Sequence, residues 1–140
     1  MSSKEQVYVL DSFAVLSYLQ GEMGMDRIKE ILRDGLAGHC RVALSVINLG
    51  EVLYITERKH GLNRAQEVLS AVVQLPVEIL PASTEAVLAA AHVKAHCAIS
   101  YADCFAVAAA NELNGTILTG DPEFGAVSGL VRVEWLRSIR

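Results

Sequence analysis

The chain has 140 residues, of which 52% are hydrophobic and only 6% aromatic, and its formal net charge is −4. This length and composition predict one domain, over residues 1–140, with a core built from Ala, Val, Ile and Leu. No apolar run reaches the roughly 18 residues of a membrane helix, and Asp11 argues against a signal peptide in the apolar N-terminal segment. We therefore expect a cytoplasmic protein without a membrane partner, and the net charge gives no sign of a nucleic-acid binder.

Strand and helix signals alternate along the chain. Apolar runs such as VYVL and TILT predict buried strands. Helical periodicity predicts the helices between them, with starts marked by Ser45, Asn63, Ser83 and Ser100. In chain order we predict a strand at 7–10, helices at 13–20 and 26–36, a strand at 41–44, helices at 46–59 and 63–75, a strand at 77–80, helices at 83–96 and 100–113, and strands at 116–119 and 131–136. The helix at 63–75 is expected to begin with a capping box of Asn63 and Gln66. This order is typical of an α/β fold with a mostly parallel central sheet flanked by helices.

Four acidic residues stand out because each lies inside or at the edge of an apolar stretch: Asp11, Glu51, Asp103 and Asp121. No Lys or Arg lies one helical turn from Glu51 or Asp103, so local ion pairs do not explain these two. A carboxylate on an apolar face is costly unless it is paired, hydrogen-bonded or bound to a metal. Asp11 and Asp121 follow strands, and Glu51 and Asp103 lie near helix starts. The four can therefore meet beyond the carboxyl ends of the strands, where such sheets bind ligands.

Carboxylate oxygens are the ligands that Mg²⁺ and Mn²⁺ prefer. Such an ion polarises a phosphoryl oxygen and lowers the pKa of a bound water, which is the chemistry that phosphodiester hydrolysis needs. We expect Asp11 and Asp103 to be the central ligands, with Glu51 and Asp121 acting through water. Ser12 and Thr119 could hold a carboxylate or a phosphate, and a turn or cap role is an equal alternative for either.

Each acid also has a purely structural interpretation. Asp103 fits a capping box with Ser100, and Asp121, which precedes a proline, resembles a helix N-cap. Asp11 could cap the helix that follows it, and Glu51 could lie on a solvated face. None of these interpretations explains why all four acids fall at strand ends and adjoining helix starts of one sheet.

Other signals in the chain are weaker. His92 and His96 have a spacing that can bind zinc, but the run HVKAH lacks the Glu of HExxH, so we expect a solvated pair. The basic run at 57–60, together with Arg64, is read as a solvated face, with a phosphate-binding patch as the alternative. The three cysteines form no CxxC pair and are expected as free thiols. No nucleotide-binding or hydrolase-triad motif is present.

The motifs around the four acids resemble those of PIN-domain nucleases. VLDSFAVLSYL is similar to the opening motif of that family, SVINLGEVLY to the second, SYADCFAVAAA to the third and TILTGDPEF to the fourth. The motifs occur in order over nearly the whole chain, which at this length looks most like the VapC-type toxins of toxin–antitoxin pairs. The resemblance implies a PIN-like fold and a metal-dependent endoribonuclease toxin. Its substrate would be RNA and its partner a cognate antitoxin.

Carried over by position, the resemblance implies a catalytic and metal-binding quartet with two supporting hydroxyls: Asp11, Glu51, Asp103 and Asp121, with Ser12 and Thr119. One departure is the proline after Asp121, where charged or polar residues are commoner. Glu123 is then a substitute ligand or a solvated acid at a helix start. The alternative function is a non-catalytic PIN-like binding or assembly module, which has no need to bury four like charges. A phosphatase of the haloacid-dehalogenase kind needs Asp-x-Asp after the first strand, and this chain has Asp-Ser-Phe there.

The helices at 46–59 and 64–75 carry more apolar residues than one buried stripe needs, including Leu49, Val52, Leu53, Val72 and Val73. Large exposed apolar patches usually mark interfaces. We therefore expect a partner on this surface, either a second copy of the chain in a homodimer or an antitoxin helix in a groove.

Overall fold

Five parallel strands form the centre of the molecule, in the spatial order β3-β2-β1-β4-β5. The computed structural model describes residues 5–22 and 24–136. The strands are β1 (Gln6–Leu10), β2 (Cys40–Ser45), β3 (Glu78–Leu80), β4 (Thr116–Thr119) and β5 (Arg132–Trp135). Leu10 at the end of β1 is paired with Leu44 of β2 on one side and with Leu118 of β4 on the other. The three central strands therefore end at the same edge of the sheet.

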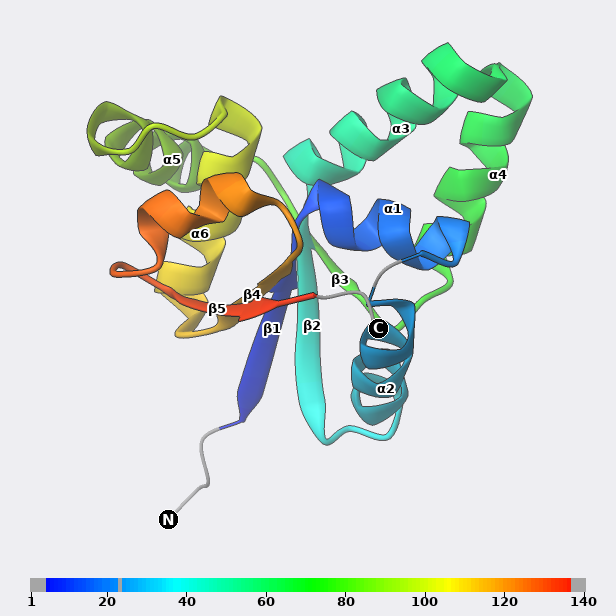
Figure 1. Cartoon of the computed structure of the whole chain (residues 1–140), viewed down its shortest axis with the longest axis horizontal. Helices are drawn as coiled ribbons and strands as arrows, with labels where there is room; N and C mark the ends of the chain where they lie inside the picture. The colour runs from blue at the N-terminus through cyan, green and yellow to red at the C-terminus, as the bar shows by residue number, and fades with distance from the viewer. Residues whose placement is uncertain (1–4, 23, 137–140) are drawn as a thin grey trace.

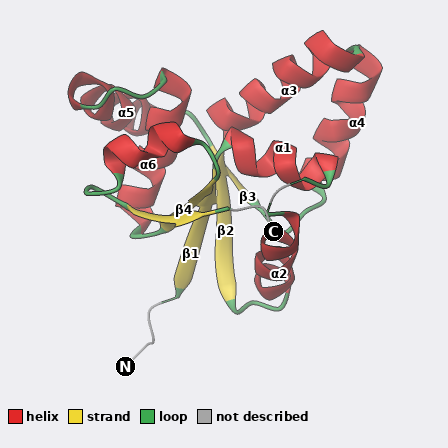
Figure 2. Cartoon of the chain, viewed as in Figure 1, coloured by secondary structure: helices red, strands yellow, loops and turns green. Residues whose placement is uncertain are grey.

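Helices cover both faces of this sheet, with the strands as the middle layer (Figures 1 and 2). They are α1 (Ser12–Gln20), α2 (Met25–Leu36), α3 (Val46–His60), α4 (Leu62–Val73), α5 (Thr84–His96), α6 (Tyr101–Leu113) and the 3-10 helix η1 (Pro122–Val127). Val9 and Ile117 belong to the apolar cluster with α5, α6 and η1, whereas Leu10 and Leu118 belong to the cluster with α1 to α4. Successive side chains of a strand point to opposite faces, and here both faces are buried. The central strands β1, β2 and β4 are therefore mostly apolar rather than alternating, whereas the edge strand β5 carries Arg132 and Glu134.

The predicted α/β fold with a parallel sheet is confirmed, and each predicted strand and helix has a counterpart. Ser45, Ser83 and Ser100 cap their helices as predicted, each accepting a hydrogen bond from a backbone N–H of the first turn. The capping box predicted at Asn63 is wrong. Helix α4 already begins one residue earlier, after Gly61, and no side chain caps it. Among the described residues, no helix has both the length and the apolar character that spanning a bilayer requires.

On α3 and α4, the division of apolar residues between buried and exposed positions differs from the prediction. Leu49, Val52 and Val72 are buried in the core, so they do not form part of an exposed patch. The reason is that α3 packs against both α1 and α4, which widens the stripe that it buries. Leu53 is partly buried, while Val73 is 60% exposed. The other exposed apolar residues on these two helices are Val46, Tyr54, Leu62 and Leu69.

Candidate functional site

The carboxyl ends of β1 and β4 bring together the first pair of site residues. Because Leu10 is paired with Leu118, Asp11 lies beside Thr119, the last residue of β4. The Thr119 hydroxyl donates a hydrogen bond to Oδ2 of Asp11. Both side chains are buried, with Asp11 only 1% exposed. The Thr119 hydroxyl therefore holds a carboxylate, which is one of the arrangements that the sequence left open for it.

Asp11 also caps the helix that follows it, as its structural interpretation predicted. Its Oδ1 accepts a hydrogen bond of 2.8 Å from the backbone N–H of Ala14, at the start of α1. Burial raises the pKa of Asp11 to about 7, although the hydrogen bonds from Thr119 and Ala14 lower it. The negative charges of Asp103 and Asp121 raise this pKa further. Capping and membership of an acidic cluster therefore coexist in this one side chain.

Asp103 lies in the first turn of α6 and is also buried. Its backbone N–H donates a hydrogen bond of 3.2 Å to the Ser100 hydroxyl oxygen, so the predicted cap is present. Burial raises the pKa of Asp103 to about 6, and a hydrogen bond with Ser100 lowers it. The charges of Glu51, Asp121 and Glu123 raise this pKa. Asp103 is therefore an acid at a helix start whose pKa is also raised by the charges of neighbouring acids of the predicted quartet.

Glu51 is held by a short chain of polar side chains. The Ser12 hydroxyl, at the start of α1, donates a hydrogen bond to Oε1 of Glu51 on α3. Nδ2 of Asn48, one turn earlier on α3, donates to the Ser12 hydroxyl at 3.3 Å and to the carbonyl of Ala102 at 3.3 Å. Asn48 therefore joins α3 to the starts of both α1 and α6. It is fully buried, and its Oδ1 has no hydrogen-bond partner among the described residues.

Asn48 is a further residue of this site, which the sequence pattern alone does not predict. The signal that identifies it is its position three residues before Glu51, on an otherwise apolar face of the helix. A buried side-chain amide with an unused oxygen is costly, and such groups in native proteins usually have a structural or functional reason. Its unused oxygen and the neighbouring carboxylates are all oxygen donors of the kind that Mg²⁺ and Mn²⁺ prefer.

Asp121 occupies the loop after β4 and caps η1, as its proline context predicted. Its Oδ1 accepts a hydrogen bond of 2.9 Å from the backbone N–H of Glu123, and its own N–H donates to the Thr119 hydroxyl oxygen at 2.9 Å. Thr119 therefore links Asp11 to Asp121. Glu123 is exposed at the start of η1, as expected of a solvated acid. Gly120 lies between Thr119 and Asp121, and a Cβ atom there would lie 2.3 Å from the ring of Phe13, so any larger residue would require that ring to move.

The four acids thus occupy one electrostatic neighbourhood at the carboxyl edge of the sheet. Asp11 interacts with the charges of Asp103 and Asp121, and Asp103 interacts with those of Glu51 and Asp121. Within the described part of the chain, no three of the acidic, His or Cys side chains form a group that could hold a metal ion as they stand. Several carboxylate oxygens of Asp11, Glu51 and Asp121 accept hydrogen bonds from Thr119, Ser12 and backbone N–H groups. The donor set suits a divalent cation, and binding one requires oxygens of at least three of these residues to come closer together.

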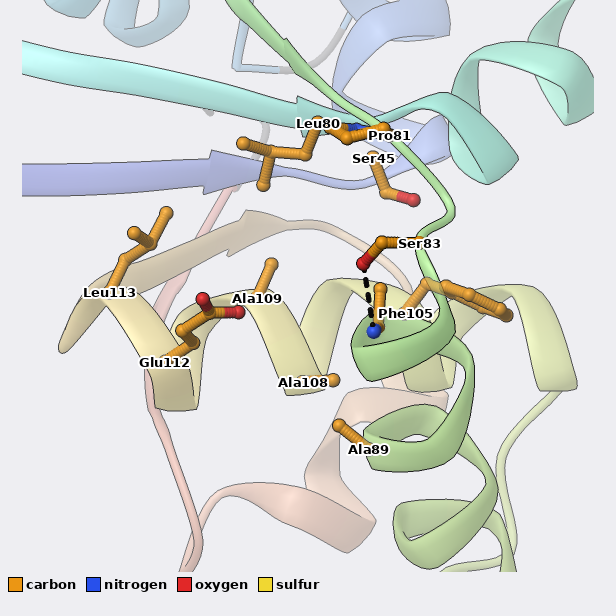
Figure 3. A pocket seen from close by; sticks show the side chains of 11 residues that line it. Ser45, Leu80, Pro81, Ser83, Ala89, Phe105, Ala108, Ala109, Glu112 and Leu113 are labelled. Atoms are coloured by element: carbon orange, nitrogen blue, oxygen red, sulfur yellow. Dashed lines mark hydrogen bonds between the residues drawn. The ribbon is translucent and has the colours of Figure 1, made fainter.

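The two remaining candidates lie apart from the acids. The rings of His92 and His96 lie edge to face on the exposed face of α5, with their centres 4.9 Å apart, as expected of a solvated pair. A hollow of about 160 Å³ lies where α5 and α6 meet the ends of β2 and β3 (Figure 3). Ser83 points into it with its hydroxyl bonded to the first turn of α5, and most of the other lining is apolar. None of the four acids lines this hollow.

Comparison with known proteins extends this description. A family model described as the PIN domain matches residues 8–130. No curated protein sequence matches the chain significantly.

Solved structures with the same fold include several toxin–antitoxin proteins. The chain is 18% identical to a chain of VapBC2 from Rickettsia felis bound to a promoter DNA fragment, with a TM-score of 0.73, covering 94% of this chain and 99% of that one. It is 19% identical to a chain of DNA-bound VapBC from Salmonella typhimurium, with a TM-score of 0.72 and coverage of 92% and 97%. It is 17% identical to the Mycobacterium tuberculosis toxin VapC20, which cleaves the sarcin-ricin loop, with a TM-score of 0.66 and coverage of 87% and 95%. At these identities the likeness establishes the fold.

Proposed function

Because this chain belongs to the PIN-domain family, whose members are typically nucleases, we propose that it is a Mg²⁺- or Mn²⁺-dependent endoribonuclease and the toxin of a toxin–antitoxin pair. The observation that carries the proposal is the meeting of Asp11, Glu51, Asp103 and Asp121 in one electrostatic neighbourhood, with two of them buried and carrying raised pKa values. Buried like charges are costly, and perturbed carboxylates of this kind cluster at functional sites. The nuclease would span residues 1–140 as a single PIN-like domain.

Asp11 and Asp103 would be the central ligands of the cation, since they are the most buried of the four acids. Glu51 and Asp121 would bind through water or orient the attacking water. A bound Mg²⁺ or Mn²⁺ would supply a polarised phosphodiester and a more acidic water. Ser12 would position Glu51, and Thr119 would position Asp11 together with the loop of Asp121. The cation would also favour the ionised carboxylates, which lowers the pKa values of Asp11 and Asp103 toward their usual range.

The choice of RNA as substrate rests on the relatives rather than on a base-specific contact. VapC20 of Mycobacterium tuberculosis, which shares the fold, cleaves the sarcin-ricin loop. A ribonuclease acting on such a substrate works in the cytoplasm. A non-catalytic binding or assembly module is the alternative, and the complete set of four acids in one neighbourhood disfavours it.

The partners that we propose are a cognate antitoxin and a second copy of the chain. Several structures of the same fold are toxin–antitoxin complexes, and the VapBC2 structure from Rickettsia felis and the VapBC structure from Salmonella typhimurium are bound to DNA. A hollow between α1, α3 and α4 has an apolar floor of Leu16, Leu19 and Val68, with His60 and Arg64 also lining it. This combination suits an antitoxin segment that carries apolar and acidic side chains. Exposed Val87 and Leu88 on α5 offer apolar area for a homodimer.

The experiment that tests the function is a cleavage assay with purified protein free of antitoxin. A structured RNA should be cut in the presence of Mg²⁺ or Mn²⁺, and cleavage should stop when EDTA is added. Asp11→Asn should remove this activity, whereas His92→Asn, a change on the exposed face of α5, should not. Cleavage that continues in excess chelator contradicts the metal-dependent mechanism, and wild-type protein that cuts no RNA with either ion supports the non-catalytic alternative.

A further inference from the structure

An exposed edge of α3 leads outward from the acidic site. Seven residues separate Glu51 from Arg58, which at about 1.5 Å per residue is roughly 10 Å along the helix axis. At about 100° per residue, Arg58 lies within about 20° of Glu51 around the helix, and Tyr54 within about 60°. Glu51, Tyr54 and Arg58 therefore line one edge of α3. Figure 1 shows α3 running from the carboxyl edge of the sheet away from the body of the molecule.

Tyr54 and Arg58 form a stacked pair on this edge. The guanidinium carbon of Arg58 lies 5.0 Å from the centre of the Tyr54 ring. Tyr54 is nevertheless 49% exposed, so the stack is not part of the core. Gly50, one turn before Tyr54, is exposed, and no atom lies within 4 Å of the position that its Cβ would take. The side of α3 next to Glu51 thus presents an aromatic ring, a guanidinium and open space.

The charge of this edge differs from that of the whole chain. The net charge is −4, yet Arg58, Lys59 and His60 end α3, and Arg64 follows in the first turn of α4. Of these four basic residues, only Arg58 lies on the edge that Glu51 and Tyr54 line. Arg64 is paired with Glu67 at 3.2 Å. Arg58 makes no ion pair with any side chain among the described residues, so its charge remains available. An aromatic ring and an unpaired guanidinium are the two groups with which proteins bind single-stranded nucleic acid, by stacking on bases and by contacting phosphates.

We propose that Tyr54 and Arg58 form a single-strand RNA-binding strip that guides the substrate into the acidic site. A base stacks on the exposed face of Tyr54, and Arg58 contacts a phosphate. The span to Glu51 equals about three stacked nucleotides, at ~3.4 Å each. This inference rests on the proposed nuclease function, because it is the position of the acids that gives the strip its direction. The proposal adds a region of the chain that would hold RNA outside the acidic site, next to the nucleotides that are cut.

The test measures RNA binding separately from cleavage. Full-length protein is titrated into a fluorescein-labelled single-stranded RNA of mixed sequence in EDTA, and binding is followed by anisotropy at several salt concentrations. Tyr54→Leu should weaken binding on the order of ten-fold, because it removes the stacking surface, whereas Tyr54→Phe should stay within about two-fold. Arg58→Ala should lower the slope of log affinity against log salt by about 0.7, the value for one phosphate contact on a single strand. Lys59→Ala is the matched control, since Lys59 has the same charge and lies about 100° further around the helix.

Each outcome bears on the strip or on the nuclease, and the two are distinguishable. If Tyr54→Leu and Arg58→Ala bind RNA as tightly as wild type, or if wild type binds no RNA at low salt, the strip is wrong. If both variants change the mass measured by light scattering and leave RNA affinity unchanged, the edge is a protein contact and the strip is again wrong. If the strip is needed for binding but the protein cuts nothing with Mn²⁺, the strip stands and the nuclease proposal fails. Melting temperatures of all variants should match wild type, because both side chains are exposed.

Discussion

The hydroxyl of Thr119 donates a hydrogen bond to Oδ2 of Asp11, although 108 residues separate the two in the chain. The same hydroxyl oxygen accepts the backbone N–H of Asp121. One buried threonine therefore positions two of the four acids of the site. The hydrogen bond from Thr119 is also the strongest of the interactions that lower the pKa of Asp11. Burial has the larger effect and raises this pKa.

Thr119→Val tests this relationship, because it keeps the shape of the side chain and removes the hydroxyl. Without the hydrogen bond, the pKa of Asp11 should rise above its value of about 7. A larger fraction of Asp11 is then protonated at neutral pH, so Mn²⁺ should bind more weakly and cleavage should need a higher pH. The pH profile of cleavage and calorimetric titration with Mn²⁺ measure both effects. Thr116→Val, on the same strand but far from the acids, is the control, and an unshifted Thr119→Val profile would rule out this role.

The stability of the metal-free protein should depend on pH in an unusual direction. The folded-state pKa values of Asp11 and Asp103 are raised above the usual value of 3.8, to about 7 and about 6. A raised folded-state pKa means that the contribution to stability is present below the unfolded value and is lost as pH rises through the folded one. The free energy of unfolding should therefore fall between pH 5 and pH 8, on the order of 1–3 kcal/mol. Urea denaturation in EDTA measures it.

Two comparisons make that result specific to the acids. Asp11→Asn removes the titrating group while an amide oxygen can still cap α1, so the slope with pH should become smaller. Added Mn²⁺ should also reduce the slope in wild type, because a cation stabilises the ionised carboxylates. A wild-type stability that rises from pH 5 to pH 8 would show that these acids do not share a buried site.

Asp103→Asn separates the catalytic from the capping interpretation of this residue. The hydrogen bond that Ser100 accepts comes from the backbone N–H of residue 103, so the substitution preserves it. The change removes one of the repelling charges, and we expect cleavage to be lost while the metal-free melting temperature stays equal or rises. As a cap alone, Asp103 would contribute about 0.5–1 kcal/mol and cleavage would survive its replacement. Glu85→Gln, the first-turn acid of α5 behind the Ser83 cap, is the matched control and should leave cleavage intact.

Asn48 should matter for both stability and activity. Asn48→Leu removes the donors to Ser12 and to the Ala102 carbonyl while filling a similar volume. The loss of buried hydrogen bonds should cost on the order of 1–3 kcal/mol, and cleavage should fall because Ser12 and Glu51 lose their support. Thr56→Val, which removes a buried hydroxyl that bonds only within α3, should reduce stability without a comparable loss of activity. Chemical denaturation and initial cleavage rates distinguish the two variants, and full activity of Asn48→Leu would show that the amide is structural alone.

The parts of this fold that could be predicted from the sequence are those encoded by residues a few positions apart. Apolar runs marked the strands, and the Ser45, Ser83 and Ser100 caps marked three helix starts, because both signals act over one or two turns of chain. The start of α4 differs from the prediction because Asn63 and Gln66 only resemble a capping box, whereas the positive φ of Gly61 turns the chain so that the helix begins at Leu62. The acids could be identified as candidates because charge is conspicuous in an apolar stretch.

The arrangement of the site depends instead on the order of strands in space. Placing β1 between β2 and β4 brings Asp11 beside Thr119, and no local pattern encodes that pairing. The same holds for Asn48, whose amide joins the starts of α1 and α6 and which looks in the sequence like one polar residue on an apolar helix. The burial of Leu49, Val52 and Val72 also depends on tertiary structure, because α3 packs against both α1 and α4. Caps and strands follow from short-range hydrogen bonding and periodicity, whereas burial and the pKa of a carboxylate are set by neighbours that only long-range contacts supply.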